Sequence, residues 1–192
     1  MDITVNEILD TKGLACPMPI VRTKKAITNL APGQVMEVQA TDKGSTADMK
    51  AWAESTGHQY LGTLEDEGVL KHYIRKASEK ETKENIKYEN VIGLDELRSK
   101  MDEKASITIL DVREPAEFVF GHIPGAVNIP LGELEDRFTE LNQDREIHII
   151  CRTGSRSDFA AQKLAEKGYK NVKNVIPGMT KWEGPIEKDK EY

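Results

Sequence analysis

At 192 residues, the chain is long enough for two small domains, each near the lower size limit for closing its own hydrophobic core. Its 38% hydrophobic and 31% charged residues are ordinary for a globular protein, and a net charge of −6 argues against general nucleic-acid or membrane binding. No apolar run approaches transmembrane length, and two cysteines in unrelated contexts suit a reducing cytoplasm better than a stapling disulfide.

The first half of the chain predicts the element order β-α-β-α-β-β, which is typical of a small two-layer α/β sandwich. Hydrophobic periodicity predicts strands over 3–9, 35–40, 58–64 and 69–75, and helices over 17–30 and 46–55. The polar residues 65–68 suit a turn between the last two strands. Ser45 and Asp48 suit a capping box at the second helix, and Gly57 suits its end.

Cys16 lies at the start of the first predicted helix, where Pro17 and Pro19 follow it. Proline is tolerated in a first helical turn because its missing N–H would be unpaired there anyway. The positive end of the helix dipole lowers the pKa of a thiol at this position, which predicts a reactive cysteine. The position alone leaves a packing role for a small apolar side chain equally open.

The surrounding sequence strengthens the case for a reactive Cys16. The segment Leu9–Pro19, followed by Lys24 and Lys25, resembles the TusA-type sulfur-carrier domain, and the resemblance extends over most of residues 3–76. Thr41-Asp42 and Gly57-His58 belong to the same pattern, whereas Lys43 departs from the proline that often follows Thr-Asp in the family. The resemblance implies that Cys16 carries sulfur.

Residues 77–85 are polar and charge-rich without apolar periodicity, which predicts a linker between a domain over 1–76 and a domain over 86–192. In the second domain, helices are expected over 94–101, 115–120, 134–141 and 158–167, alternating with strands over 107–111, 126–129, 147–151 and 171–175. Such alternation predicts a parallel α/β sheet with its functional site at the carboxyl ends of the strands.

Cys151 ends one of these strands and opens a short loop, Arg152-Thr153-Gly154-Ser155-Arg156, before a helix. Backbone N–H groups, the helix dipole and two arginines at such a position stabilise a thiolate and any anionic group on its sulfur. Most unpaired cysteines are buried structural residues. The glycine, serine and arginines around Cys151 favour an active-site loop instead.

The length of the loop limits its chemistry. Four residues separate Cys151 from Arg156, whereas the phosphatase and arsenate-reductase loops that share this logic have five and enclose a tetrahedral oxyanion. A shorter loop leaves room for a single additional sulfur atom on the cysteine. Phosphate-ester hydrolysis or arsenate reduction stays open as an alternative that the loop length disfavours.

Together with this loop, three further motifs resemble the rhodanese sulfurtransferase domain, from near Tyr88 to the C-terminus. These motifs span residues 111–118, 121–130 and 177–182. The resemblance implies a Cys151 persulfide formed from thiosulfate or a small-molecule persulfide, with Arg152, Thr153, Gly154, Ser155 and Arg156 binding the substrate. It implies no cofactor and no metal.

The two resemblances together predict a sulfur relay from Cys151 to Cys16 and on to a sulfur-accepting protein. A flexible linker of nine residues spans about 15–18 Å, which permits transfer within one molecule at roughly millimolar effective concentration. Transfer between molecules is equally allowed. The alternative is a non-catalytic carrier, in which both cysteines accept sulfur or selenium from a separate enzyme.

The remaining polar and aromatic candidates are predicted to be structural. Arg113 and Glu117 are spaced for an i,i+4 ion pair, and Asp111 suits a structural hydrogen-bonding role at a strand end. His122 is expected to be packed and hydrogen-bonded, because a stabilised thiolate needs no base. The other expected structural residues are Trp52 and Trp182 in the cores, and His58, His72 and His148, which lack metal-ligand spacing.

Overall fold

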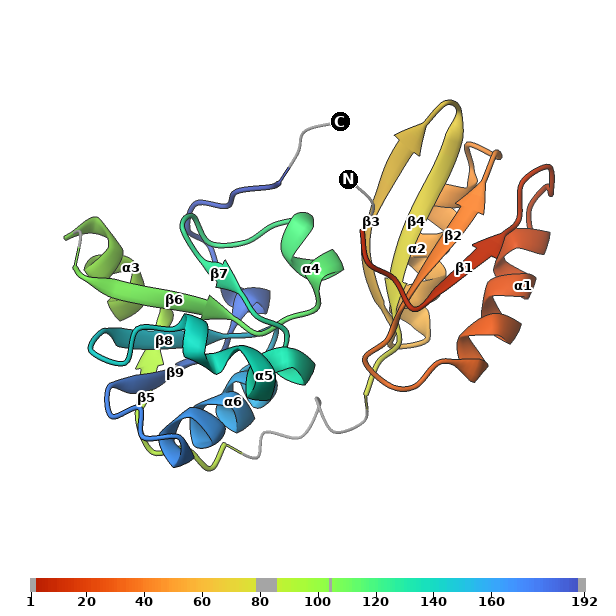
Figure 1. Ribbon diagram of the computed structural model, residues 1–192. Coiled ribbons are helices and arrows are strands. Elements are labelled where there is room, and N and C mark those ends of the chain that lie inside the picture. The colour runs from red at the N-terminus through yellow and green to blue at the C-terminus, as the bar shows by residue number, and fades with distance from the viewer. Residues whose placement is uncertain (1–2, 79–85, 104, 190–192) are drawn as a thin grey trace. The chain divides into compact units, whose positions relative to one another are not determined.

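The computed structural model describes residues 3–78, 86–103 and 105–189, and it contains two compact units that divide between residues 79 and 80 (Figure 1). Each unit has its own sheet and its own hydrophobic core. All but the first two residues of the linker expected at 77–85 lie outside the described residues.

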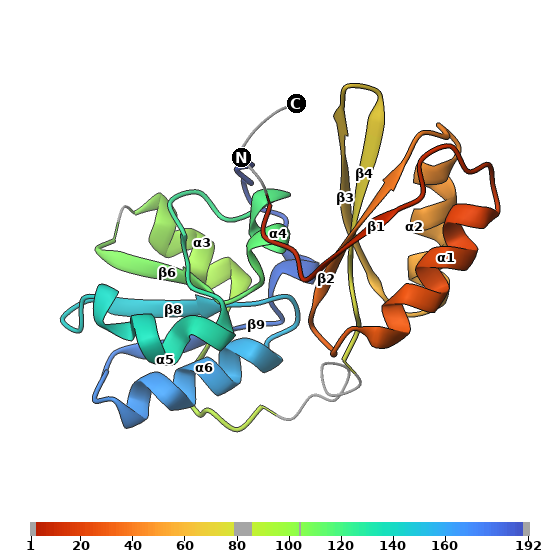
Figure 2. The same cartoon turned by 45° about the vertical axis from the view of Figure 1, so that its right-hand side comes forward.

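The N-terminal unit confirms the predicted order β-α-β-α-β-β. Its elements are β1 (Glu7–Asp10), α1 (Met18–Ala26), a 3₁₀ turn (Ile27–Asn29), β2 (Val35–Ala40), α2 (Ser45–Ser55), β3 (Gln59–Asp66) and β4 (Val69–Arg75). The sheet order is β1-β2-β4-β3, with β1 parallel to β2 and the other pairs antiparallel. Both helices cover one face of this sheet (Figure 2), so only that face needs an apolar core.

The hairpin between β3 and β4 turns at Glu67 and Gly68, whose φ angles are +49° and +80°. Positive φ at both central residues gives the turn the twist that matches its flanking strands. The strand before the turn runs two residues further than the sequence predicts, because cross-strand pairing continues to Asp66 and Val69.

The capping box predicted at α2 is wrong. The helix begins after Gly44, and the Ser45 hydroxyl is buried inside the first turn, 2.8 Å from His72 Nε2. Asp48 instead accepts a hydrogen bond from the Cys16 thiol at 2.8 Å. Both polar groups of the predicted box therefore bind partners from distant parts of the chain, which a local pattern does not reveal.

The C-terminal unit confirms the predicted parallel α/β sheet. Its strands are β5 (Val91–Gly93), β6 (Ile107–Asp111), β7 (Val127–Asn128), β8 (Glu146–Ile150) and β9 (Val172–Ile176), in the order β5-β9-β8-β6-β7 with parallel pairings. Its helices are α3 (Leu94–Asp102), α4 (Pro115–Val119), α5 (Leu134–Arg137) and α6 (Ser155–Glu166), with 3₁₀ turns at Leu131–Glu133, Phe138–Glu140 and Met179–Lys181.

Strand β8 lies at the centre of this sheet and is buried on both faces. Ile147 and Ile149 join one core cluster, with α5 and α6, while Ile150 joins a second cluster with α3 and Trp182. Burial on both sides explains why this strand carries isoleucine on both faces, at 147 and 149 on one and at 150 on the other. Cys151 follows directly and belongs to the first cluster.

Several elements in this unit differ from the sequence prediction, and the helix expected over 134–141 is α-helical only to Arg137, after which Phe138–Glu140 forms a 3₁₀ turn. Strand β5 was not predicted, because it has three residues and buries only Ile92. Helix α6 begins at Ser155 rather than at 158, because Gly154 adopts the left-handed conformation at its start, with φ +100°. The polar run Ser155-Arg156-Ser157 therefore forms the first helical turn and not a loop.

The buried His72 makes the N-terminal unit sensitive to acid. Its Nδ1 lies 2.8 Å from Thr63 Oγ1 and its Nε2 lies 2.8 Å from Ser45 Oγ, and the side chain has no solvent exposure. Burial lowers the pKa of His72 from 6.5 to about 4. The unfolded chain therefore binds more protons than the folded unit between these two pH values.

We expect the free energy of unfolding of this unit to fall by about 2 kcal/mol as the pH falls from 6.5 to 4. The His72 contribution is complete above pH 6.5 and does not change further below about pH 4. Urea unfolding followed by Trp52 fluorescence, in a Trp182→Phe background, measures the effect. His72→Gln should flatten the pH dependence, and an equal slope in both proteins would contradict the assignment.

Candidate functional site

Cys151 lies just beyond the carboxyl end of β8, and its side chain is fully buried. Its Sγ accepts a hydrogen bond from the Gly154 N–H at 3.1 Å and lies 3.3 Å from the Ser157 hydroxyl. Helix α6 begins immediately after this loop, with its positive dipole end toward the loop. Ser157 was not among the sequence candidates, although its place directly before the helix expected over 158–167 was a usable signal.

Neighbouring backbone fixes the shape of the Cys151 loop. Met179 N–H donates to the Cys151 carbonyl at 2.8 Å, and Thr180 N–H donates to the Arg152 carbonyl at 3.0 Å. A Cβ on Gly178 would come within 2.6 Å of the Cys151 carbonyl oxygen, and Gly178 has φ +86°. The backbone of the motif at 177–182 therefore holds the Cys151 loop in place through these hydrogen bonds. Only glycine fits at 178.

Asn174 secures the other end of the loop. Its side-chain amide donates to the Gly154 carbonyl at 3.2 Å, and the residue has no solvent exposure. The side chain of Ile176 packs closely against Gly154. Sequence reasoning missed Asn174, because it lies inside a strand twenty residues away and carries no local signal.

Arg156 is buried and forms a bidentate ion pair with Glu117, at 2.7 and 2.9 Å. The predicted Arg113–Glu117 pair is therefore wrong, because α4 begins at Pro115 and leaves Arg113 outside the helix. Arg113 pairs instead with Asp111 at 2.6 Å, which confirms a structural role for Asp111. Glu117 also accepts the Glu114 N–H in the capping box of α4.

Arg152 therefore provides the positive charge of the Cys151 loop that no carboxylate of the described residues offsets. Since Glu117 offsets the Arg156 guanidinium, Arg152 is left as the loop cation with no side-chain partner in the described part of the chain. Arg152, Thr153 and Ser155 are half-buried, whereas Gly154 and Arg156 are buried. The structure thus places the Gly154 N–H against the Cys151 sulfur, directs Arg156 to Glu117, and gives the two arginines different environments.

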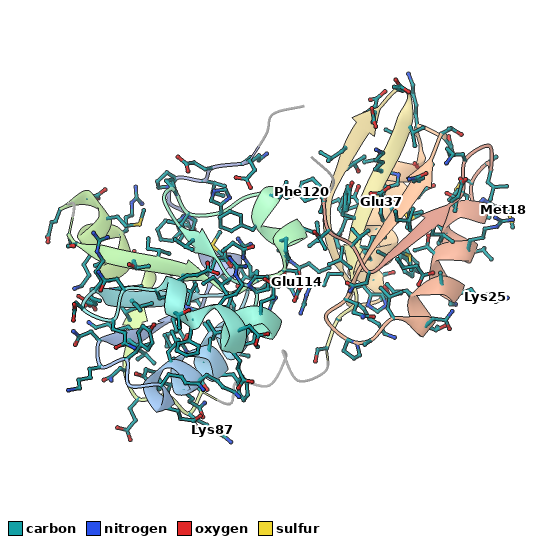
Figure 3. The ribbon with its side chains drawn as sticks, viewed as in Figure 1. Met18, Lys25, Glu37, Lys87, Glu114 and Phe120 are labelled. Carbon is teal, nitrogen blue, oxygen red and sulfur yellow. The ribbon has the colours of Figure 1, made fainter. Side chains whose placement is uncertain are left out.

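The environment of Cys16 differs from that of Cys151, because Cys16 is exposed and Cys151 is buried. Cys16 lies just before α1, whose Met18 and Lys25 point outward from the sheet (Figure 3). Its thiol donates to Asp48 Oδ2 at 2.8 Å. This hydrogen bond raises the pKa of Cys16, and partial removal from water and the negative charges of Asp48 and Asp42 raise it further.

The predicted lowering of the Cys16 pKa is therefore wrong. A helix start favours an anion through its unpaired N–H groups. In α1 the residues Pro17 and Pro19 have no N–H, and Met18 donates its N–H to the Ala15 carbonyl at 3.0 Å. The Asp48 carboxylate, in direct contact with the thiol, therefore has a larger effect on the Cys16 pKa than the few free N–H groups at this helix start.

The other candidates have structural positions, as predicted. His122 donates from Nδ1 to the Phe118 carbonyl at 2.9 Å and stacks on the Phe118 ring at 3.6 Å between centroids. Trp182 is buried in a core cluster, and Trp52 packs against the N-terminal core. Within the described ranges, no three His, Cys, Asp or Glu side chains gather in a way that could hold a metal ion.

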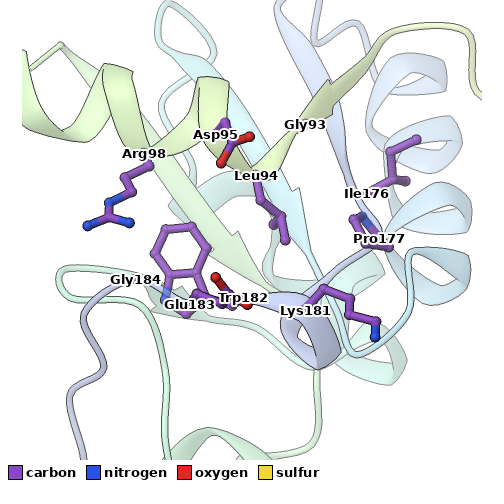
Figure 4. A pocket seen from close by; sticks show the side chains of 10 residues that line it. All are labelled: Gly93, Leu94, Asp95, Arg98, Ile176, Pro177, Lys181, Trp182, Glu183 and Gly184. Atoms are coloured by element: carbon purple, nitrogen blue, oxygen red, sulfur yellow. The ribbon is translucent and has the colours of Figure 1, made fainter.

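A cavity of about 420 Å³ lies at the carboxyl ends of β5 and β9 (Figure 4). Its charged lining residues are of both signs, Asp95 and Glu183 with Arg98 and Lys181, and Trp182 forms another part of its wall. No residue of the 151–156 loop lines it. The cavity therefore does not extend the Cys151 site, although Ile176 touches both.

The sequence matches two family models in chain order, sulfurtransferase TusA over residues 7–76 and the rhodanese-like domain over residues 93–185. Bacillus subtilis YrkF, provisionally named a sulfur carrier protein, is 52% identical over 180 residues, which are 94% of this chain and 97% of YrkF. A sulfurtransferase of Allochromatium vinosum is 33% identical over 93 residues, covering 48% of this chain and 87% of that protein.

A solved structure, a rhodanese-like domain protein from Staphylococcus aureus, superposes with a TM-score of 0.50 and 33% identity, covering 53% of this chain and 99% of that protein. The fold and these matches define a protein that handles sulfur. The chain belongs to the family in which a TusA sulfur-carrier domain precedes a rhodanese domain. Its function is to carry or transfer sulfur between a donor and an acceptor. In the described residues, no helix has the length and apolar character needed to cross a membrane.

We expect Gly178→Ala to lower the free energy of unfolding of the C-terminal unit by at least about 2 kcal/mol, because the new Cβ meets two carbonyl oxygens at positive φ. Urea unfolding followed by Trp182 fluorescence measures the loss. Gly132→Ala is the matched control, since an added Cβ there meets nothing within 4 Å and φ is not positive. A Gly178→Ala value within 0.5 kcal/mol of this control would contradict the role of Gly178.

Proposed function

We propose that the chain is a sulfurtransferase that takes the outer sulfur of thiosulfate, or of a small-molecule persulfide, onto Cys151 and relays it to Cys16. The observation that carries this proposal is the environment of Cys151 Sγ. The sulfur is buried, accepts the Gly154 N–H at 3.1 Å and lies 3.3 Å from the Ser157 hydroxyl. These donors suit an anionic sulfur on the cysteine.

The positive charge of the Cys151 loop also suits thiosulfate as the sulfur donor. Thiosulfate is a dianion, and Arg152 offers a guanidinium that no described carboxylate neutralises. In this proposal Arg156 acts mainly through its ion pair with Glu117, which ties the first turn of α6 to α4. Thr153, Gly154 and Ser155 supply the backbone of the loop, whose N–H groups bind the substrate sulfur.

In the first step, the Cys151 thiolate attacks the outer sulfur of thiosulfate. A new S–S bond forms on Cys151, the S–S bond of thiosulfate breaks, and sulfite leaves with the bonding electrons. The charges balance, since a thiolate and a dianion give a persulfide anion and sulfite dianion. With a small-molecule persulfide as the donor, a thiol leaves in place of sulfite.

In the second step, Cys16 attacks the outer sulfur of the Cys151 persulfide, and Cys151 leaves as a thiolate. The exposure of Cys16 supports a carrier role, because an exposed persulfide can meet the thiol of an acceptor protein. The order of events follows from this contrast, with the buried cysteine as the entry point and the exposed cysteine as the exit.

Mass spectrometry of the intact chain tests the relay. After exposure to thiosulfate or glutathione persulfide, we expect one added sulfur on each cysteine in wild type and on Cys151 alone in Cys16→Ser. We expect no added sulfur in Cys151→Ser, because the entry point is missing. Loading of Cys16 in the Cys151→Ser variant would make the two cysteines independent acceptors and remove the relay.

A non-catalytic carrier, loaded with sulfur or selenium by a separate enzyme, is the second candidate. The exposed Cys16 and the carrier name of YrkF favour it. The two candidates differ in turnover with thiosulfate and cyanide, in which cyanide removes the outer sulfur as thiocyanate and regenerates the Cys151 thiolate.

We expect the wild-type chain and Cys16→Ser to form thiocyanate over many turnovers, and Cys151→Ser to form none above the uncatalysed background. A colorimetric thiocyanate assay measures this. A single burst of at most one thiocyanate per chain would support the carrier instead. Loss of turnover in Cys16→Ser would overturn the assigned order of the two cysteines.

A further inference from the structure

The contact between Cys16 and Asp48 joins two segments that are 32 residues apart. Asp48 lies in the first turn of α2 and is half-buried, and its Oδ2 accepts the Cys16 S–H at 2.8 Å. The sheet between the segments holds this geometry, because Thr11 just ahead of the Cys16 loop donates its N–H to the Gln39 carbonyl at the end of β2 at 2.8 Å.

This contact determines the resting state of Cys16. The carboxylate accepts a hydrogen bond from the thiol, and it disfavours the thiolate because two negative charges would then face each other. Asp42 adds a further negative charge near the thiol. At neutral pH, Cys16 therefore rests as a protonated thiol, with its proton directed at Asp48.

A protonated thiol does not attack a persulfide, since the thiolate is the nucleophile in such exchanges. The proton must leave as the new S–S bond forms. A general base must lie within hydrogen-bond reach of the proton that it removes, and Asp48 meets this condition.

We propose that Asp48 is the general base that removes the Cys16 proton during sulfur uptake and returns it during sulfur release. This role rests on the proposed function of Cys16 as a sulfur acceptor. It makes Asp48 a catalytic residue of the carrier domain, because its carboxylate touches the reacting thiol.

Uptake balances as follows. The Cys151 persulfide anion left by the first step takes one proton from solvent. Cys16–SH, the Asp48 carboxylate and this protonated persulfide then give Cys16–S–SH, the Asp48 carboxylic acid and the Cys151 thiolate. The S–H bond of Cys16 and the S–S bond of Cys151 break, while the new S–S bond and the Asp48 O–H bond form. One negative charge moves from Asp48 to Cys151.

Release reverses the role of Asp48. An acceptor thiolate attacks the outer sulfur on Cys16, the S–S bond breaks, and the Cys16 sulfur takes the proton from the Asp48 carboxylic acid. The products are the acceptor persulfide, the Cys16 thiol and the Asp48 carboxylate. Asp48 thus returns to its starting state after each sulfur atom has passed.

The test compares two rates in Asp48→Asn, which keeps the size of the side chain but removes the base. The first is the rate of Cys16 alkylation by iodoacetamide at pH 7, measured in the Cys151→Ser background. The second is the rate of sulfur transfer to Cys16 from Cys151 preloaded with thiosulfate, measured by rapid quench and mass spectrometry after removal of the donor.

We expect the two rates to move in opposite directions. Alkylation should become several-fold faster, since loss of the carboxylate favours the Cys16 thiolate. Sulfur transfer should slow by about 100-fold, since a general base typically contributes 10²- to 10⁴-fold. Asp48→Glu, which keeps a base, should restore much of the transfer rate.

Asp42→Asn is the matched control, because it removes a nearby charge without touching the Cys16–Asp48 hydrogen bond. It should speed alkylation modestly and leave the transfer rate within about threefold of wild type, far from the change expected for a lost general base. A faster transfer in Asp48→Asn would show that the carboxylate acts only through its charge, and unchanged rates would remove any role for the contact. Either result overturns the base role, whereas a wild-type chain in which no sulfur reaches Cys16 overturns the relay itself.

Discussion

The structure of the Cys151 site depends on the two hydrogen bonds that Met179 and Thr180 donate to the carbonyls of Cys151 and Arg152. Carbonyl oxygens would repel an anionic sulfur, and here both are engaged with the neighbouring 3₁₀ turn. The loop can then direct the Gly154 N–H at the sulfur. The close approach of the backbone at Gly178 makes this arrangement possible, so the motif at 177–182 supports the Cys151 loop through backbone contacts.

The two cysteines illustrate two ways of controlling a thiol. Cys151 is withdrawn from water and faces N–H and O–H donors, and the nearest buried carboxylate of α4 is paired with Arg156. Cys16 is open to solvent and contacts a carboxylate directly. The first environment places hydrogen-bonding groups around the sulfur, and the second places a negative charge beside it, which raises the pKa of Cys16. In the relay that we propose, sulfur therefore moves from a buried site with hydrogen-bond donors to an exposed site beside a carboxylate.

Much of the fold followed from sequence periodicity. The burial of β8 on both faces produced the apolar run that located Cys151, and the proline pair located Cys16 at a helix start. The polar contacts were less predictable. The Arg113–Glu117 pair failed because it depended on where one short helix begins, and the Cys16–Asp48 contact joins segments that only the folded sheet brings together. Interactions within one turn leave a local signal, whereas interactions across the fold do not.

The hydrogen bond from Cys16 to Asp48 also affects how readily oxidants react with Cys16. Hydrogen peroxide converts cysteine to sulfenic acid by reaction with the thiolate, so an exposed cysteine is normally vulnerable in proportion to its ionised fraction. The carboxylate raises the pKa of Cys16 and keeps that fraction small. A thiol on the surface is thereby made less reactive toward small diffusing oxidants, although it stays exposed.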